Sequence, residues 1–279
     1  MNVYIVGLGL IGASYAAGLR AAGHTIDGFD INADTLQKAK TANLIDTGRL
    51  EGMRHAEILI LALYPNDIPA FLQTHRHLIP ETALITDVAG VKKPLETALH
   101  KQGITRGRYV SHHPMAGKAK QGFDAHDGTL FKGANCILIA QDGAESSQLD
   151  TLQTVLADLG FGRFITVDAA RHDRLIAFTS QLTHALAVAL MHADSDPLTP
   201  QATGDSFRDL TRIAEINAPM WCELFLANQH ALTEEIERFQ TVLDRLKQHI
   251  QDEDATALTA MFETSTTKRQ SFNRLTRKV

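Results

Sequence analysis

The sequence of 279 residues is poor in cysteine and tryptophan and has no excess of positive charge. Its two cysteines, Cys136 and Cys222, are far apart, one inside the apolar run NCILIA and the other directly after the single tryptophan. We therefore expect two buried thiols, with neither a disulfide nor a bound metal. The net charge of −5 argues against nucleic acid as the main partner, since that usually requires a basic face.

Long apolar runs are also scarce. No basic stretch followed by an apolar one precedes the first strand, and no apolar run approaches the ~18 residues of a membrane span. We therefore expect neither a signal peptide nor membrane contact, and we place the chain in the cytoplasm. With 44% hydrophobic and 21% charged residues, the chain can bury a core and is not disordered.

The first half of the chain alternates short apolar runs with helical patterns, such as 10–22 and 34–42. Several of the runs are apolar throughout, as expected for strands that are covered on both faces. The runs are 2–7, 25–30, 56–63, 83–88, 108–113, 134–140 and 163–167. This alternation predicts an α/β domain over residues 1–168, a Rossmann-type doubly wound and mostly parallel sheet.

After Asp168, which suits a helix N-cap, the pattern is helical throughout. We predict one long helix over 169–193, a shorter one over 206–215, a long amphipathic one over 219–250, and a last one toward Arg274. So small a domain cannot cover helices of this length by itself. We therefore expect residues 169–279 to form an all-helical dimerisation domain that packs against a second copy of the chain, giving a homodimer.

The clearest motif is G-x-G-x-x-G, formed by Gly7, Gly9 and Gly12. It follows a predicted strand, opens a helix, and is followed by Asp30 at the end of the second strand, which is the context of the dinucleotide fingerprint. The helix N-terminus offers N–H groups to the phosphates. Asp30 should accept hydrogen bonds from the adenosine ribose, and its charge would repel a 2′-phosphate, so we predict NAD as the cofactor and not NADP.

Five further motifs occur in order along almost the whole chain: TDVAGVK, HPMAG, SQLTHALAVAL, FRDLTRIA and PMWCELFLAN, at 86–92, 113–117, 180–190, 207–214 and 219–228. Together with the glycine-rich turn they resemble the prephenate/arogenate dehydrogenase family of tyrosine biosynthesis. The resemblance implies NAD-dependent oxidative decarboxylation of prephenate to 4-hydroxyphenylpyruvate. It also implies a Rossmann domain followed by a helical domain that builds a dimer.

The resemblance implies specific roles for several residues. His113 matches the catalytic histidine that accepts the ring hydroxyl proton, a task that suits a group titrating near neutral pH. Its neighbour His112 should point to the other face of the strand. Arg212 matches the arginine that binds a substrate carboxylate in bidentate fashion. Arg208 is more simply explained by an ion pair, and Asp209 could orient either arginine.

Further contacts are expected on the same basis. Substrate contacts are expected at Gln181, His184, Gly90, Lys118, Gln229 and Trp221, and cofactor contacts at Leu10, Ile11, Leu63, Tyr64, Asp87 and Val88. His184 could equally be structural, Lys118 a solvated loop residue, and Lys92 cofactor-proximal or structural. His172 has no assigned role.

Three positions depart from the family pattern. Gly90 stands where most members have a serine that holds the ring hydroxyl, and Lys118-Ala119 stands where prephenate-type members often have Thr-Glu. Alanine at 119 points toward arogenate. The neutral Gln229 points toward prephenate, since arogenate-selective relatives tend to carry an acid there that pairs with the substrate's ammonium. We favour prephenate for this direct physical reason, with arogenate or dual cyclohexadienyl specificity as the alternative.

Two other functions are weighed against this one. A dehydrogenase of the β-hydroxyacid type uses a helical lysine, and the predicted helix 169–193 contains none. A non-catalytic NAD-binding sensor would fit the loss of the serine at Gly90. The presence of both His113 and Arg212 argues against the sensor.

Overall fold

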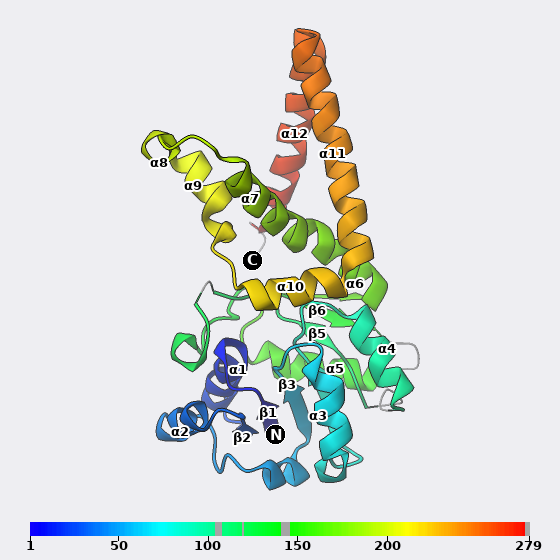
Figure 1. The fold of residues 1–279 in the computed structure, drawn as a ribbon. Helices are drawn as coiled ribbons and strands as arrows, with labels where there is room; N and C mark the ends of the chain where they lie inside the picture. The colour runs from blue at the N-terminus through cyan, green and yellow to red at the C-terminus, as the bar shows by residue number, and fades with distance from the viewer. Residues whose placement is uncertain (104–107, 119, 141–145, 277–279) are drawn as a thin grey trace. The chain divides into compact units, whose positions relative to one another are not determined.

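The structure is a computed structural model that describes residues 1–103, 108–118, 120–140 and 146–276, with side chains as far as residue 272 (Figure 1). The chain forms two compact units, Met1–Asn228 and Gln229–Val279. The first unit contains all described strands and also several helices that follow Asp168, so it extends beyond the predicted domain boundary. That boundary stays a prediction.

A four-stranded parallel sheet lies at the centre of the first unit, in the order β2-β1-β3-β4. Its strands are β1 (Asn2–Val6), β2 (Thr25–Phe29), β3 (Ile58–Leu61) and β4 (Leu84–Asp87). Alternate side chains of β1 enter two separate clusters, with Val3 and Ile5 in one and Tyr4 and Val6 in the other. Both faces are therefore buried, as the uninterrupted apolar runs predict.

Helices cover both faces of this sheet (Figure 1). On one face, α1 (Leu10–Ala21) and α5 (Ser146–Ala157) contribute to the same cluster as Val3 and Ile5. On the other, α3 (Asp67–His75) and α4 (Lys93–Lys101) pack on Tyr4 and Val6. The remaining short elements are α2 (Ala33–Thr41), η1 (Leu50–His55) and η2 (Arg76–Leu78). The doubly wound α/β architecture is confirmed.

The predicted strands after β4 form a separate three-stranded sheet, β5-β6-β7. Its strands are β5 (His112–His113), β6 (Asn135–Ile139) and β7 (Arg163–Val167). A parallel bridge between Ile85 and Tyr109 continues the first sheet into this segment, but β5 pairs with β6 antiparallel. Between these two strands the described residues contain one short 3-10 turn, η3 (Phe123–Ala125). A crossover helix of the kind that usually joins parallel neighbours is absent from that described part.

The predicted helix over 169–193 is continuous but contains a π-helical turn. It comprises α6 (Ala169–Ile176), η4 (Ala177–Gln181) and α7 (Leu182–Ala193), and Asp168 caps it by accepting a hydrogen bond from the Arg171 amide at 2.7 Å. Such turns often mark functional positions. After it follow α8 (Thr199–Ala202), α9 (Asp205–Thr211), η5 (Arg212–Ala214) and α10 (Ala218–Ala227).

The helix Ala169–Ala193 also corrects the expectation about apolar runs. It has a mean hydropathy of 1.3 over an 18-residue window, which is long and apolar enough to cross a membrane by composition alone. Its polar side chains, however, make hydrogen bonds inside the first unit. Asp173 accepts from the backbone of Lys92 and Lys93, and Gln181 is bonded to Asn228. These contacts tie one face of the helix to the first unit, while 28% of the 18-residue window is buried and apolar side chains such as Phe178 remain exposed.

The prediction of a single long helix over 219–250 is wrong. The helix is broken at Asn228, whose backbone (φ −117°, ψ 28°) leaves the helical region. The Asn228 side chain is buried and donates to the Gln181 side chain at 2.7 Å and to the Asp173 carbonyl at 2.9 Å. These bonds to another helix fix the position of the break, and they depend on residues about 50 positions away that a local pattern does not show.

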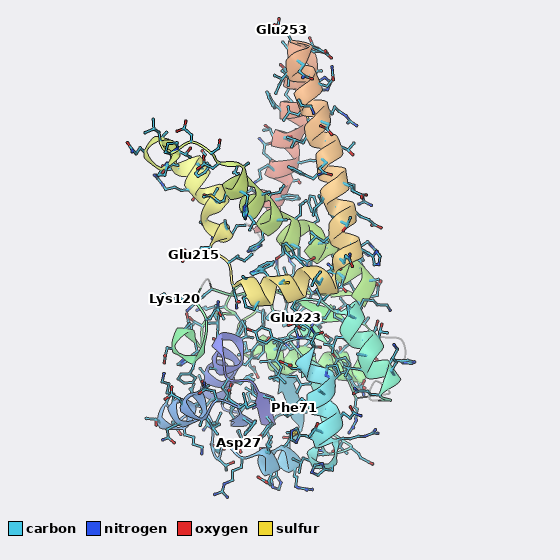
Figure 2. The ribbon with its side chains drawn as sticks, in the orientation of Figure 1. Asp27, Phe71, Lys120, Glu215, Glu223 and Glu253 are labelled. Atoms are coloured by element: carbon cyan, nitrogen blue, oxygen red, sulfur yellow. The ribbon has the colours of Figure 1, made fainter. Side chains whose placement is uncertain are left out.

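The second unit is a helical hairpin of α11 (Gln229–Gln251) and α12 (Ala255–Thr276), which lie side by side (Figure 1). Glu253, labelled in Figure 2, lies in the turn between them with a φ of 52°. Leu232 is the one buried residue of α11, and no described side chain of α12 is buried. Two helices alone cannot enclose a core, so large apolar side chains of this unit such as Leu243 and Phe262 are exposed.

Candidate active site

The glycine-rich turn has the backbone that a dinucleotide requires. Gly7 has a φ of 86°, and a Cβ there would overlap the Ala62 carbonyl, so only glycine fits. A Cβ on Gly12 would overlap the Gly7 carbonyl, so this glycine allows α1 to start directly against the turn. At Gly9 a Cβ would meet no atom within 4 Å, which leaves the backbone open to a phosphate. The three glycines thus fit a bound pyrophosphate for three different reasons.

Asp30 connects the second strand to this turn. Its Oδ2 accepts a hydrogen bond from the Leu8 amide at 2.7 Å, and its Oδ1 accepts one from the Asn32 amide at 2.8 Å. The carboxylate is therefore fixed beside the turn, where its charge opposes a 2′-phosphate. The next residue, Ile31, is 95% exposed and offers an apolar surface at the same strand end. Sequence reasoning did not single out Ile31, although its place directly after Asp30 could have shown it.

The other predicted cofactor residues lie at the carboxyl ends of neighbouring strands, where open parallel sheets bind ligands. Leu10 and Ile11, at the start of α1, are half-buried, and Gly9 before them provides no side-chain cap. The first amides of α1 are thus free of a side-chain cap and suited to phosphates. Leu63 lies next to Gly7, and Tyr64 is 48% exposed. Val88, just after β4, is half-buried.

The side chain of Asp87 points into the core, and its predicted contact with the cofactor stays a prediction. It is fully buried, with Oδ1 accepting from Lys92 Nζ at 2.8 Å and from the Ala89 amide at 2.9 Å, while Oδ2 accepts from the Tyr109 hydroxyl. Burial by itself would raise the pKa of this carboxyl, but the charge and hydrogen bonds of its partners hold the pKa below its usual value. Both carboxylate oxygens are thus occupied within the protein.

Lys92, whose role the sequence left open, is an interior residue of the same cluster. Besides Asp87, its ammonium donates to the carbonyl of His112 at 2.6 Å. The buried cation therefore holds the backbone directly before His113.

His112 points away from His113, as predicted. Its ring is fully buried between the Tyr15 hydroxyl, 2.7 Å from Nε2, and the Thr86 hydroxyl, 2.7 Å from Nδ1. Burial, aided by the nearby Lys92 charge, lowers the pKa of His112 to about 3. It is a neutral structural side chain that links α1 to β4.

His113 lies on the opposite side of β5, half-buried, and contacts a second histidine. Its Nδ1 is 2.9 Å from Nε2 of His172, and Nδ1 of His172 is 2.7 Å from Oδ1 of Asp173. Asp173 in turn accepts from the amides of Lys92 and Lys93, both at 2.8 Å. Burial, followed by the neighbouring His172, Lys92 and His112, lowers the pKa of His113 well below its usual 6.5. His113 is therefore neutral at neutral pH, the form that accepts a proton.

Sequence reasoning missed His172 and Asp173. Both lie in the first turns of α6, where histidine and aspartate carry no distinctive signal. His172 is 0% exposed and Asp173 4% exposed. An adjacent buried His-Asp pair just inside a predicted helix start would have been the available hint.

Gln181 is buried and hydrogen-bonded within the protein, and its predicted contact with the substrate stays a prediction. It is 1% exposed, its Nε2 donates to the Leu224 carbonyl at 2.9 Å, and its Oε1 accepts from Asn228. Leu224 also reaches Gly90, where a Cβ would lie 3.3 Å from a Leu224 methyl. The predicted contacts at Gln181 and Gly90 are thus brought together by α10. Glu223 on the same helix, labelled in Figure 2, accepts from the Asn66 amide at 3.0 Å.

The predicted substrate residues His184, Trp221 and Arg212 are brought together as well. The rings of His184 and Trp221 stack with centroids 3.8 Å apart and planes at 29°. Nδ1 of His184 is 2.9 Å from the Ser180 carbonyl. Burial, and to a lesser degree the charge of Arg212, lowers the pKa of His184. Arg212 is exposed and makes no ion pair within the described residues, so its guanidinium is available to an anion.

The other predicted residues are placed less favourably. Lys118 pairs with Asp127 at 3.0 Å, which supports its interpretation as a loop lysine, while Ala119 lies outside the described residues. Arg208 pairs with Asp205 and not with Asp209, as its ion-pair interpretation predicts. Gln229 begins α11 and is exposed.

Within the described ranges of the chain, no group of three histidine, cysteine or acidic side chains is arranged to hold a metal ion. The geometry instead combines a dinucleotide turn with a neutral, half-buried histidine.

Comparison with known proteins agrees with this combination. The family model "Prephenate dehydrogenase, nucleotide-binding domain" matches residues 15–165, and the model "Prephenate dehydrogenase, dimerization domain" matches residues 168–264. The chain belongs to the prephenate dehydrogenase family. The family, the Rossmann-type fold with its following helical domain, and the activity of an NAD-dependent oxidoreductase are confirmed.

Relatives within the family are similar over nearly the whole chain. The prephenate dehydrogenase of Lactococcus lactis subsp. cremoris is 32% identical over 97% of this chain and 77% of its own length. A solved structure of prephenate dehydrogenase from A. aeolicus, in complex with hydroxyphenyl propionate and NAD+, has a TM-score of 0.88, 28% identity and 98% coverage of both chains. Synechocystis arogenate dehydrogenase has a TM-score of 0.86, 29% identity, and coverage of 98% and 100%. Membership alone therefore does not fix the substrate.

Proposed function

We propose that the chain oxidises and decarboxylates prephenate to 4-hydroxyphenylpyruvate, with His113 as the base. The observation that carries this proposal is the state of His113. Its Nδ1 is bound to His172, its Nε2 makes no hydrogen bond within the described residues, and its low pKa keeps it neutral. A neutral histidine with a free Nε2 can accept the hydroxyl proton while hydride leaves the carbon that bears this hydroxyl.

Different residues of the chain would carry out different parts of the reaction. The glycine turn and Asp30 would hold NAD, which accepts the hydride from the ring carbon when bound. His113 takes the proton of the ring hydroxyl as the C–H bond breaks, and returns it to the oxygen once loss of CO2 has made the ring aromatic. Atoms and charge then balance without a further reactant. Because aromatisation drives the reaction, the protein mainly orients the reacting groups.

Arg212 would bind one of the two substrate carboxylates, beside the stacked pair of His184 and Trp221. Its guanidinium is exposed and unpaired within the described residues, and a bidentate bond to a carboxylate is its favoured interaction. We favour prephenate over arogenate because Gln229, by the family resemblance, offers no charge for an ammonium group. Arogenate or dual cyclohexadienyl specificity is the second candidate, since one structural neighbour is an arogenate dehydrogenase.

We also propose that the chain acts as a homodimer, as the family model of a dimerization domain indicates. Large apolar side chains are exposed on helices of both units, among them Phe178 at 56% and Leu226 at 65% in the first unit, and Leu243 at 50% and Phe262 at 58% in the second. Exposed apolar surface of this kind marks an interaction site. A cytoplasmic location stays a prediction from the sequence.

The decisive assay follows NADH absorbance with the purified chain, prephenate and arogenate in parallel. A higher kcat/KM for prephenate supports the proposal, whereas a large preference for arogenate establishes the second candidate. Turnover of neither substrate, with NAD still bound, would identify a sensor. His113→Asn should lower kcat by about 10²- to 10⁴-fold, the usual contribution of a general base. His24→Asn, at a histidine that pairs with Asp158 and precedes β2 at its amino end, away from the carboxyl ends of the strands, is the control.

A further inference from the structure

His113 does not stand alone: His172 and Asp173 continue from it into the protein interior. This inference rests on the proposed function, in which His113 is the base, and it concerns how that base is prepared. The three side chains are joined by contacts of 2.9 Å and 2.7 Å, and they come from β5 and from the first turns of α6.

The direction of the hydrogen bonds follows from Asp173. Its Oδ1 and Oδ2 accept from the amides of Lys92 and Lys93, which can only donate, so both oxygens act as acceptors. The ring nitrogen that faces Oδ1, Nδ1 of His172, must then carry the hydrogen. A neutral imidazole has one N–H, so Nε2 of His172 bears a lone pair. That lone pair faces Nδ1 of His113, which must therefore be the protonated nitrogen of His113.

We propose that His172 and Asp173 are positioning residues that hold His113 in the Nδ1–H tautomer, which leaves its Nε2 as the atom that takes the substrate proton. When the proton arrives, His113 donates more strongly to His172, and the carboxylate of Asp173 lies at the far end of the chain of hydrogen bonds to balance the charge. In other enzymes, too, a carboxylate that accepts from one ring nitrogen of a catalytic histidine fixes the tautomer of that histidine.

The surroundings of the two rings favour this arrangement of hydrogens. His172 is fully buried, so in the folded protein no bulk solvent competes for its lone pair. The charged and titratable groups around the two rings are Asp173 on α6, Lys92 before α4, His112 on β5 and Asp87 on β4. Burial and the Lys92 cation lower the pKa of His172, although Asp173 acts in the opposite sense. Both rings are thus neutral before the reaction, the condition that the tautomer argument requires.

The tautomer can be read directly in the intact protein. In nitrogen-15 spectra of histidine-labelled wild-type chain, Nδ1 of His113 should have the shift of a protonated ring nitrogen and Nε2 that of an unprotonated one, with the signals assigned by their loss in His113→Asn. The reverse pattern, with the hydrogen on Nε2, would overturn the proposal. This measurement needs no substrate. If the chain oxidised neither cyclohexadienol, the proposed function would fail while the tautomer could still be read.

Two variants of His172 separate positioning from packing. The amide of glutamine reaches about as far as Nε2 of histidine, so His172→Gln can still accept from His113. The amide of asparagine reaches only as far as Nδ1, so His172→Asn can contact Asp173 but not His113. We expect His172→Gln to keep kcat within about tenfold of wild type. We expect His172→Asn to lower kcat by about 10²-fold or more, with KM for the substrate and affinity for NAD little changed.

The matched controls are His24→Gln and His24→Asn, since His24 also faces a carboxylate, Asp158, at 2.9 Å, but precedes β2 at the opposite edge of the sheet. Neither should alter kcat. Equal losses of kcat in the two His172 variants, or a loss of substrate affinity instead of kcat, would show a packing role and refute the proposal. Should His172→Asn fail to fold, the spectra of the wild-type chain still decide.

Discussion

Replacement of Lys92 by methionine tests the buried cluster that supports the active site. Lys92 and Asp87 are both almost completely buried, with side chains 1% and 0% exposed, and their charges are 2.8 Å apart. Lys92→Met keeps much of the side-chain volume and removes the cation. Asp87 then retains the Tyr109 hydroxyl and the Ala89 amide but has no opposite charge. The hydrogen bond that fixes the His112 carbonyl is lost as well.

The expected loss of stability is large because one charge remains without its partner. Removal of one member of a buried ion pair typically costs about 3–5 kcal/mol. For a domain of this size, each kcal/mol lowers the melting temperature by about 2–4 °C, so we expect a fall of about 6–20 °C at fixed protein concentration. The neighbouring Lys93→Met is the control. Its ion pair with Glu96 is 60% exposed on the lysine side, and such substitutions usually change stability by less than about 0.5 kcal/mol.

The pH dependence of this loss follows from the Asp87 carboxyl. In the wild type its pKa is held below the usual value, so its contribution to stability is present above the unfolded pKa and is lost as pH falls through the folded pKa. In Lys92→Met, only the remaining hydrogen bonds from Tyr109, Ser111 and Ala89 oppose the effect of burial, and we expect the Asp87 pKa to rise above its unfolded value. Its contribution is then retained at low pH and lost as pH rises through the folded pKa. The penalty of the variant should therefore be larger at about pH 8 than at about pH 5.

Urea denaturation at both pH values measures the loss of stability in Lys92→Met. The double variant Asp87→Asn/Lys92→Met tests whether the unpaired carboxylate causes this loss. A neutral amide in place of the Asp87 carboxylate should recover most of the lost stability, because no buried charge is then left without a partner. A penalty below about 1 kcal/mol for Lys92→Met, or one equal at the two pH values, would contradict the buried charge pair.

Three further predictions concern the site itself. Gly9→Ala should fold normally but bind NAD more weakly, whereas Gly12→Ala should unfold at lower temperature because its Cβ overlaps the Gly7 carbonyl. Calorimetry and NAD titration distinguish the two variants, and equal behaviour of both would contradict the geometry. kcat/KM should decline with acid only below pH 6.5, since the His113 pKa is lowered from that value, and a limb at or above it would be inconsistent. Arg212→Ala should raise KM for prephenate about tenfold or more with kcat little changed, and steady-state kinetics would disprove this if KM stayed constant.

The features that the sequence predicted well are local ones. The strand and helix alternation of the first half depends on runs of side chains a few residues apart, and the glycine turn depends on three positions within six residues. The N-cap at Asp168 is also local, since it accepts from an amide three residues later. Such signals need no knowledge of distant contacts, and the structure reproduces them.

Two departures from the sequence-based expectations are local: helix Ala169–Ala193 is more apolar than expected, and Cys222, expected to be buried, is exposed. The other departures involve contacts between side chains that a local pattern does not show. Asn228 breaks the predicted long helix because of partners 47 and 55 positions away. Asp87 points inward, where Tyr109, 22 positions later, and Lys92, five positions later, both donate to it. Gln181, expected at the substrate, is bonded to the backbone of Leu224, 43 positions later. Local pattern provides no information about these pairings.

By itself the sequence determined the fold class, the dinucleotide turn and the family, because each is encoded by residue types at fixed short spacing. It also determined that His113 and His112 point to opposite faces, since a strand alternates by its geometry. The tertiary structure alone decided that His172 and Asp173 lie behind His113, and that Lys92 holds the backbone before it. The physical reason is that a hydrogen bond depends on distance in space, and His113 and His172 are 59 positions apart in the chain but 2.9 Å apart in the fold.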